Sequence, residues 1–540
     1  MGNKTKKTRN MVFSTIIVML GLFFTKGSGF MRDILVGIKF DQNMYRDAFT
    51  LAFTIPDLFY NLLVGGAIFS TVAPYMSGAI AVGEEKRGIR TVSIFISVIS
   101  VVMAIACTVG TIFSGPLYSL YALNRSGEDG INPQTLELAS NASKMLFPQI
   151  FFIMLAALCI GIMNSYKRFT ATSFGPTIYN ICVLASIFIF AGSTPESLIM
   201  TTGGILVSAI IYFLFQYFMG FDKLKQIRFI FKPNDPEFLR LFRRAIPILI
   251  SSSIVQINVV VLNYFAGQFD AGSIYGFRNA STIWQIPYGI FTVAISTVMT
   301  PELAGLYESK KYEDASSLLS RSLKTSMFIM IPSALFIWLE SKDVVKAIYQ
   351  WSSHYTDTNA ETASIFLKGF VTAIVTASVV HIVNHAFYAT GNTRIPLVSG
   401  IFGLFMNPVF CFILIKMGVG PLSLSVAYSL TNLLQMALLI TLYCMNKKLA
   451  PRKMFPMLIK STVCALVALV IVFAFDFIIP AQGGKILQLA IISAKGIACV
   501  VVYFGMALAL KMDEATFWIN KMTSKLKTRG SKKADNGIEA

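Results

Sequence analysis

Long apolar segments recur along the whole chain, and each is close to the length that crosses a lipid bilayer. A membrane-spanning helix needs roughly 20 predominantly apolar residues, and about fourteen segments meet this criterion. The sequence is 55% hydrophobic and only 14% charged, whereas soluble proteins carry about 25% charged residues. These features predict an all-α polytopic membrane protein. The predicted spans cover residues 11–36, 46–76, 91–116, 143–164, 172–192, 199–219, 240–266, 273–302, 321–340, 362–389, 396–416, 421–445, 457–480 and 486–511.

Basic side chains concentrate in alternate connections between these segments. The connections predicted to lie inside are rich in Lys and Arg, at residues 84–90, 166–169, 222–232, 308–324, 391–394, 446–453 and 521–533, whereas 125–130, 194–197 and 357–361 are acidic or nearly neutral. This positive-inside pattern predicts that both termini are cytoplasmic. It also accounts for the formal net charge of +19, so a nucleic-acid partner is not expected.

Two short patterns recur about six spans apart. Ile55-Pro56 leading to Pro74 is repeated as Ile286-Pro287 leading to Pro301, and 164–176 resembles 384–396. An even offset keeps the orientation, so the repeats should be parallel. We therefore expect two lobes around a central cationic cavity, with an extra C-terminal helix pair. The predicted domains are an N-lobe (1–220), a basic amphipathic cytoplasmic linker (221–237), a C-lobe (238–445), the C-terminal pair (446–511) and a basic cytoplasmic tail (512–540).

Ionisable residues interrupt the apolar sequence between Gly29 and Pro74. An ionisable group in hydrocarbon costs several kcal/mol, so it should face a partner, a water-filled cavity or a cargo. Arg32 is the leading candidate, because a guanidinium keeps its charge and binds phosphate through paired hydrogen bonds. On one regular helix Lys26 would not cluster with it, but Gly27-Ser28-Gly29 could break the helix and bring them together. The alternative is that Arg32 pairs with an aspartate and holds the bundle together.

The same stretch resembles the MurJ/MviN family. The shared positions, in one register, are Arg32-Asp33, Asp47-Ala48-Phe49, Ala52-Phe53, Ile55-Pro56, Gly66-Ala67 and Pro74. The resemblance implies a proposed lipid II flippase of the multidrug/oligosaccharidyl-lipid/polysaccharide exporter superfamily, in a bacterial cell membrane. It would move an undecaprenyl-diphosphate-linked cell-wall precursor to the outer leaflet by alternating access. The alternatives are an exporter of another polyprenyl-linked glycan and a transport-inactive scaffold for wall synthesis. An enzyme is not expected, because the short loops offer no catalytic constellation.

The resemblance also bears on the site residues. Relatives carry arginine at Lys26, a basic residue at Tyr60 and commonly an arginine at Thr282. Arg278 lies one helical turn before Thr282, so it could reach the same cavity or anchor the helix at the interface. Gln256 and Asn263 share a helix face. Their side chains could either line the cavity or form hydrogen bonds between helices. The candidate substrate-binding residues are Arg32, Lys26, Asp33, Asp47, Arg278, Gln256 and Asn263.

No cofactor or metal centre is expected. Some relatives use an asparagine like Asn407 in a cation site, but the carboxylate expected one turn later is Cys411 here. His381 and His385 have a spacing that can bind metal, yet no nearby ligand completes a site, so a structural role is favoured. Coupling to the membrane potential or to a monovalent cation is left open. The expected partners are lipid II or a related lipid, membrane lipids and cell-wall synthesis proteins.

Overall fold

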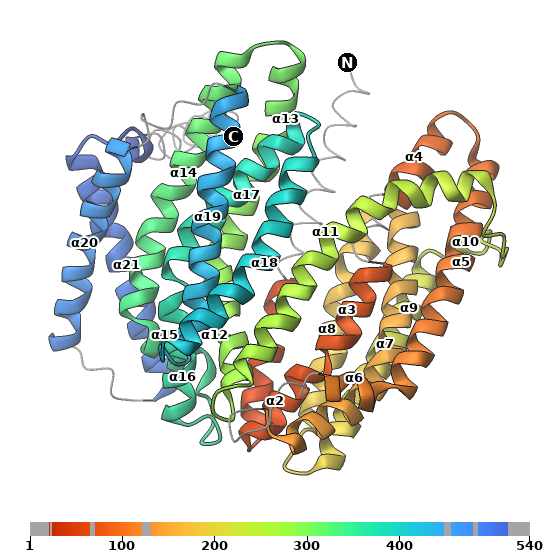
Figure 1. Ribbon diagram of the computed structural model, residues 1–540, viewed down its shortest axis with the longest axis horizontal. Coiled ribbons are helices and arrows are strands. Elements are labelled where there is room, and N and C mark those ends of the chain that lie inside the picture. Colours follow the sequence, from red (N-terminus) through yellow and green to blue (C-terminus); the bar gives the residue numbers. More distant parts are fainter. Residues whose placement is uncertain are drawn as a thin grey trace, which may run out of the picture. The chain divides into compact units, whose positions relative to one another are not determined.

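The computed structural model describes residues 21, 24–64, 71–120, 131–447, 455–478 and 484–516. All regular elements in these ranges are helices (Figure 1), and eleven of the described helices are long and apolar enough to span a membrane. The predicted fold class is therefore confirmed, whereas the expected count of about fourteen spans is not. Much of the predicted span 11–36, Gly66-Ala67 and the end of the tail lie outside the described residues.

The described chain forms two compact units. The first unit holds the described residues up to Arg278 together with Tyr349–Thr362, and the second holds Asn279–Ile348 and the described residues from Ala363 onward. Up to the unit boundary in α12, the helices are one over residues 24–39, α2 (Asn43–Ala52), α3 (Thr54–Leu63), α4 (Ala73–Ala81), α5 (Glu85–Ile112), α6 (Ser114–Leu120), α7 (Pro133–Ser165), α8 (Phe169–Phe190), α9 (Pro195–Met219), α10 (Phe221–Leu224), α11 (Pro236–Ala266) and α12 (Ser273–Pro287). They are followed by the π-helix η2 (Tyr288–Thr292), α13 (Val293–Glu308), α14 (Tyr312–Leu339), α15 (Ser341–Tyr349), α16 (Asp357–Gly369), α17 (Val371–Ala389), α18 (Arg394–Lys416), α19 (Leu422–Lys447), α20 (Phe455–Ile478) and α21 (Lys485–Ala509).

Three long helices of the first unit begin with the same local signal, a polar residue followed by proline. The side chains of Asn132, Thr194 and Asp235 each accept a hydrogen bond from a backbone N–H in the first turn of α7, α9 and α11. Such a residue satisfies an N–H that has no partner within the helix, and proline fits the next position because it has no N–H. These caps explain why the helices begin before the apolar residues do.

α7 is the central helix of the first unit. It packs against α2, α5 and α9, while α8 packs on α9 and α11 on α3 (Figure 1). The contact between α5 and α7 depends on Gly110, where a Cβ atom would lie 2.2 Å from the ring of Phe147. A small residue allows close approach of helices in a membrane, where dispersion contacts drive association.

Three predicted spans are divided. The segment 91–116 contains α5 and the start of α6, separated at Phe113. The segment 46–76 contains α2, α3 and α4, with a turn residue at Phe53, and 362–389 contains α16 and α17, separated at Phe370. By contrast, Gly27-Ser28-Gly29 lies inside the helix over residues 24–39, so the expected helix break there is wrong. Glycine lowers helix stability by about 1 kcal/mol but does not remove a backbone hydrogen bond.

The predicted linker 221–237 contains the short α10 and then an extended stretch that lies along α5. There the N–H groups of Arg228 and Ile230 donate to the hydroxyls of Ser93 (3.2 Å) and Ser97 (2.8 Å). The helix that follows, α11, belongs to the first compact unit, although the repeat pattern assigned it to the C-lobe. The repeat-based domain boundaries stay a prediction, because grouping residues into compact units does not show which helices correspond to each other in the two sequence repeats.

Glu237, in the first turn of α11, joins that helix to α5. Its carboxylate accepts hydrogen bonds from Arg87 Nε (2.6 Å), from the hydroxyl of Thr91 (2.6 Å) and from the hydroxyl of Tyr75 (3.1 Å). The hydrogen bond from Arg87 is the main reason that the pKa of Glu237 is lowered from 4.5 to about 2. This end of α11 is therefore fixed by a charged network.

In the second unit, α17 packs against α13, α14 and α19, and α18 packs against α19. The predicted C-terminal pair, α20 and α21, packs together and against α14 (Figure 1). A buried ion pair accompanies this contact, since Lys495 Nζ of α21 lies 2.9 Å from a carboxylate oxygen of Glu340, and the two side chains are 1% and 2% exposed. The pair links the C-terminal helices to the end of α14.

A second polar cluster surrounds the two histidines of α17. His381 contacts the Tyr288 hydroxyl through Nδ1 and the Ser296 hydroxyl through Nε2, both at 2.9 Å, and His385 Nδ1 lies 3.1 Å from the Thr300 hydroxyl. The imidazoles thus link α17 to η2 and α13, a structural role. Among the described residues, no three His, Cys, Asp or Glu side chains are grouped so that they could hold a metal ion.

We predict that Glu340→Gln destabilises the full chain by about 3–5 kcal/mol, because it leaves the buried ammonium of Lys495 without its counter-charge. Thermal unfolding of the purified protein in detergent measures the effect. The matched control is Glu313→Gln, at an exposed position of the same helix. A double variant, Glu340→Leu with Lys495→Met, should recover most of the loss. Equal unfolding temperatures for Glu340→Gln and the control would contradict the prediction.

A pH series should reveal the contribution of Glu237. A carboxylate with a lowered pKa stabilises the fold above its unfolded-state pKa, and this stabilisation is lost as the pH falls toward the folded-state value. The wild type should therefore unfold at a higher temperature than Glu237→Gln at neutral pH, and the difference should shrink between pH 4.5 and about 2. A difference that stays constant over this interval would refute the role assigned to Glu237.

Candidate functional site

Asp33 joins two arginines in the first unit. Arg32, its neighbour on the helix over residues 24–39, places Nε 3.2 Å and Nη2 3.1 Å from Asp33 Oδ1. Arg278 of α12 places Nη2 3.3 Å from the same oxygen. The carboxylate therefore orients both guanidinium groups, and the structure brings together three of the predicted site residues.

Other polar groups surround this cluster. The Tyr275 hydroxyl donates to the backbone carbonyl of Asp33 at 2.5 Å, which ties α12 to the helix that carries Arg32. The carboxylate of Asp57 in α3 interacts electrostatically with Arg32 and Arg278. Asp33 and Asp57 therefore offset part of the positive charge of the two guanidinium groups.

The arginines remain accessible despite these contacts. The side chains of Arg32 and Arg278 are 22% and 28% exposed, whereas that of Asp33 is 9% exposed. A guanidinium has five N–H donors. The planar fork of donors matches phosphate. The cluster can therefore hold two positive groups in position for an anionic ligand.

For Arg32, the pairing that was the alternative to cargo contact is observed. Arg278 likewise pairs with Asp33, which fits the reading that it reaches the same site as Arg32. Contact of either side chain with cargo stays a prediction.

Asp47 has a different environment. Its carboxylate oxygens accept hydrogen bonds from the backbone N–H groups of Gly272 (2.6 Å) and Tyr275 (2.8 Å), and the residue is 5% exposed. It therefore caps the N-terminal end of α12, where backbone N–H groups lack helical partners. The structure gives Asp47 the task of orienting α12, from which Arg278 projects, and its predicted contact with substrate stays untested.

Arg46 is a buried charge that the sequence analysis did not single out. It is 0% exposed, and it donates to the carbonyls of Phe40 (2.7 Å) and His354 (2.7 Å) and to the side chain of Asn43 (2.9 Å). Because its partners are mainly backbone carbonyls, no pattern of acidic residues indicates its role.

The remaining candidates lie apart from the Asp33 cluster in their contacts. Lys26 is exposed and Gln256 is half-buried. Asn263 is 7% exposed and donates to the Thr54 hydroxyl at 3.0 Å, so it forms the interhelical hydrogen bond that was one of its two predicted roles. In the second unit, Asn407 is buried and lies 3.9 Å from the Cys411 sulfur. The cation site suggested for Asn407 stays a prediction.

Comparison with protein families gives one match over most of the chain. The family model described as "Lipid II flippase MurJ" matches residues 39–494. The chain is 26% identical over 425 residues to the probable lipid II flippase MurJ of Buchnera aphidicola subsp. Acyrthosiphon pisum (strain APS), covering 77% of this chain and 81% of that protein. It is 24% identical over 444 residues to the probable lipid II flippase MurJ of Vibrio cholerae serotype O1, covering 80% and 82%.

Solved structures show the same fold. A lipid II flippase MurJ in an inward closed conformation matches with a TM-score of 0.75 at 23% identity, covering 92% of this chain and 99% of that chain. An inward-facing multidrug resistance MATE family transporter of the MOP superfamily matches with a TM-score of 0.66 at 15% identity, covering 80% and 98%. At these identities the likeness establishes the fold and leaves the cargo to other arguments.

We predict that Asp47→Ala destabilises the protein by about 1–3 kcal/mol, because two backbone N–H groups at the start of α12 lose their acceptor in a buried place. Hydrogen exchange of residues 272–276 and thermal unfolding in detergent measure the loss. The matched control is Asp270→Ala, since Asp270 is exposed beside the same turn. Unchanged exchange in Asp47→Ala would show that the capping contact does not hold α12.

Proposed function

The chain belongs to the lipid II flippase MurJ family, and from this membership we propose that it is a transporter of lipid II or a closely related undecaprenyl-diphosphate lipid. It moves the lipid from the cytoplasmic to the outer leaflet of a bacterial cell membrane, for cell-wall synthesis. The observation that carries the proposal is the family match over residues 39–494. The eleven described apolar helices agree with a multi-pass membrane protein.

The Asp33 cluster supplies the chemistry that such a cargo requires. A diphosphate is an anion that guanidinium groups bind through paired, charge-assisted hydrogen bonds. Arg32 and Arg278 are positioned by one carboxylate and are partly exposed, so a diphosphate can approach them without first breaking the cluster apart. Asp33 offsets part of the positive charge of the two arginines, which lowers the cost of holding these charges in a membrane.

Transport follows by alternating access in this proposal. The head group binds to the arginines while the polyprenyl tail stays in lipid, and the site then opens to the other side of the membrane. The membrane potential can assist the return of a net positive site, since each elementary charge that crosses 100 mV contributes about 2.3 kcal/mol. Both termini lie in the cytoplasm in this arrangement, as the positive-inside pattern predicts.

Two sequence features keep a second cargo in view. Tyr60 and Thr282 occupy positions where relatives carry basic residues, so the site has fewer cations than the resemblance leads one to expect. A polyprenyl-linked glycan with a different head group would need a different set of contacts. The same reduction in charge is compatible with a transport-inactive scaffold for cell-wall synthesis proteins.

The proposal is tested by replacing the essential lipid II flippase of a bacterial host with this chain. The wild type should support growth, and Arg32→Ala should abolish it at matched membrane abundance, because a neutral side chain removes the paired contacts with phosphate. Arg32→Lys should support growth only in part, since lysine keeps the charge but lacks the planar fork. Arg243→Ala, at an exposed position of α11, is the charge-matched control.

Each outcome decides between the readings. Failure of a well-expressed wild type would count against lipid II as the cargo and favour another lipid-linked glycan or a scaffold. Growth with Arg32→Ala equal to that of the wild type would remove Arg32 from the transport site.

A further inference from the structure

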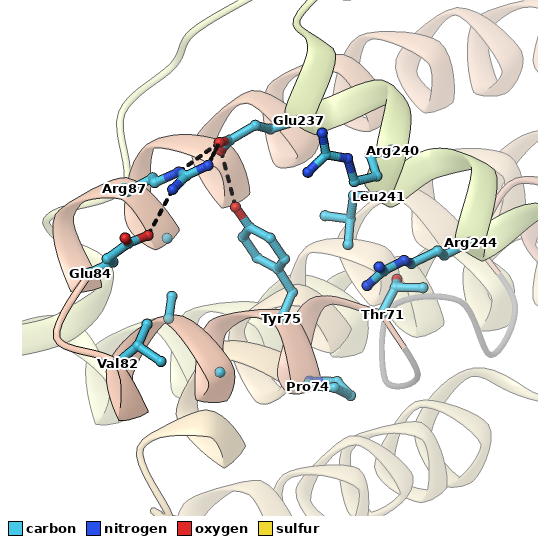
Figure 2. Close-up of a pocket in the computed structure, with 13 residues that line it drawn as sticks. Thr71, Pro74, Tyr75, Val82, Glu84, Arg87, Glu237, Arg240, Leu241 and Arg244 are labelled. Atoms are coloured by element: carbon cyan, nitrogen blue, oxygen red, sulfur yellow. Dashed lines mark hydrogen bonds and ion pairs between the residues drawn. The ribbon is translucent and has the colours of Figure 1, made fainter.

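A second polar site lies in the first unit, where α4, α5 and the start of α11 meet (Figure 2). It is a pocket of about 560 Å³, within the range of about 300–1,000 Å³ that is typical of ligand sites. Arg32, Asp33 and Arg278 are not among its lining residues, so it is separate from the Asp33 cluster. Nothing in the proposed transport mechanism uses it.

The acidic side of the pocket is already satisfied. Glu237 accepts hydrogen bonds from Arg87, Thr91 and Tyr75, and Glu84 accepts one from Arg87 Nη1 at 2.8 Å. Figure 2 shows the contacts of Arg87 with Glu237 and Glu84, and of Tyr75 with Glu237, along one wall. Neither carboxylate is hydrogen-bonded to Arg240 or Arg244. The lining holds three guanidinium groups and two carboxylates, so the pocket has a net positive charge.

The other two guanidinium groups belong to Arg240 and Arg244, which lie one turn apart on α11 and both line the pocket. Figure 2 shows both side chains projecting from α11 toward the pocket, with Arg244 near Thr71. Both arginines are exposed, and within the described part of the chain neither has an ion-pair or hydrogen-bond partner. Residues four apart share one face of a helix, so the two guanidinium groups can act on one ligand.

The opposite wall of the pocket is apolar and open. It includes Pro74, Ala79 and Val82, and Val82 is 72% exposed. The pocket also adjoins the basic connection 84–90, which the positive-inside pattern assigns to the cytoplasmic side. A cationic pair beside exposed apolar surface at a membrane face suits a ligand that has both an anionic head and hydrocarbon. Basic pockets of this kind on the cytoplasmic side of membrane helices bind lipid head groups.

We propose that Arg240 and Arg244 form a binding site for the phosphate group of an anionic membrane lipid. The two guanidinium groups donate paired hydrogen bonds to the phosphate oxygens, and the apolar wall covers the first part of the lipid chains. Because the ligand contacts α11 on one side and α4 on the other, its binding stabilises the arrangement of these helices. The site goes beyond the proposed function, and its test does not depend on transport.

The test measures thermal unfolding of the purified full chain in detergent, followed by tryptophan fluorescence. Short-chain phosphatidylglycerol is titrated into the wild type and into Arg240→Gln with Arg244→Gln, with phosphatidylcholine as the lipid of zero net charge and inorganic phosphate as the soluble source. A ligand that binds only the folded state raises the unfolding temperature in a concentration-dependent way. Arg243→Gln is the matched control, since Arg243 is an exposed neighbour that is not among the residues lining the pocket.

Phosphatidylglycerol should stabilise the wild type and Arg243→Gln alike. The double variant should need a lipid concentration at least about tenfold higher for the same rise in unfolding temperature. Equal stabilisation of the double variant and the wild type would overturn the site, and so would an equal loss in Arg243→Gln. Stabilisation by phosphatidylcholine as strong as by phosphatidylglycerol would overturn anion recognition. If inorganic phosphate stabilises the protein as strongly as the lipid does, with the same dependence on the arginines, the proposal that the bound phosphate group belongs to a lipid would be overturned. If the double variant fails to fold, Arg240→Gln and Arg244→Gln are each titrated alone.

Discussion

A lipid bilayer supplies no hydrogen-bond partners, so every polar group placed within it must find its partner inside the protein. This constraint accounts for the helices, and it also governs the buried side chains. Arg46 donates to backbone carbonyls of Phe40 and His354, and the carboxylate of Asp47 accepts from the N–H groups that begin α12. Phe40 directly follows the helix over residues 24–39 and Gly272 directly precedes α12, so at both places a charged side chain completes the backbone where a helix ends or begins.

Charges that could serve a ligand are held by the same rule. Arg32 and Arg278 are oriented by Asp33. Lys495 and Glu340 show the limit of this behaviour, since both are almost completely buried and have a purely structural role. Exposure separates the two kinds of pair. Groups that keep part of their surface free can exchange a protein partner for a ligand, whereas the fully buried pair cannot.

The amino-acid sequence predicts the long apolar helices well, because hydrophobic length is a local property. It also places Arg32, Asp33 and Arg278 among the candidate site residues, and the structure brings these three side chains together. The sequence does not reveal the division at Phe53, whereas the division at Phe370 directly follows Gly369, and glycine is a local signal for the end of a helix. Nor does it reveal that Lys495 meets Glu340, 155 residues away, because that pairing depends on tertiary packing. The sequence thus indicates which charged residues belong to the site, whereas the backbone contacts of Asp47 and Arg46 depend on tertiary packing.

The π-helix η2 changes how the sequence around it should be read. In a regular α-helix, residues eight positions apart differ by about 80° in direction around the axis. Tyr288 and Ser296 lie eight positions apart in the sequence, yet both contact the imidazole of His381. The wider i→i+5 turn between them takes up the difference. A helical wheel drawn with one period across residues 273–308 therefore assigns the wrong faces to the residues on one side of η2.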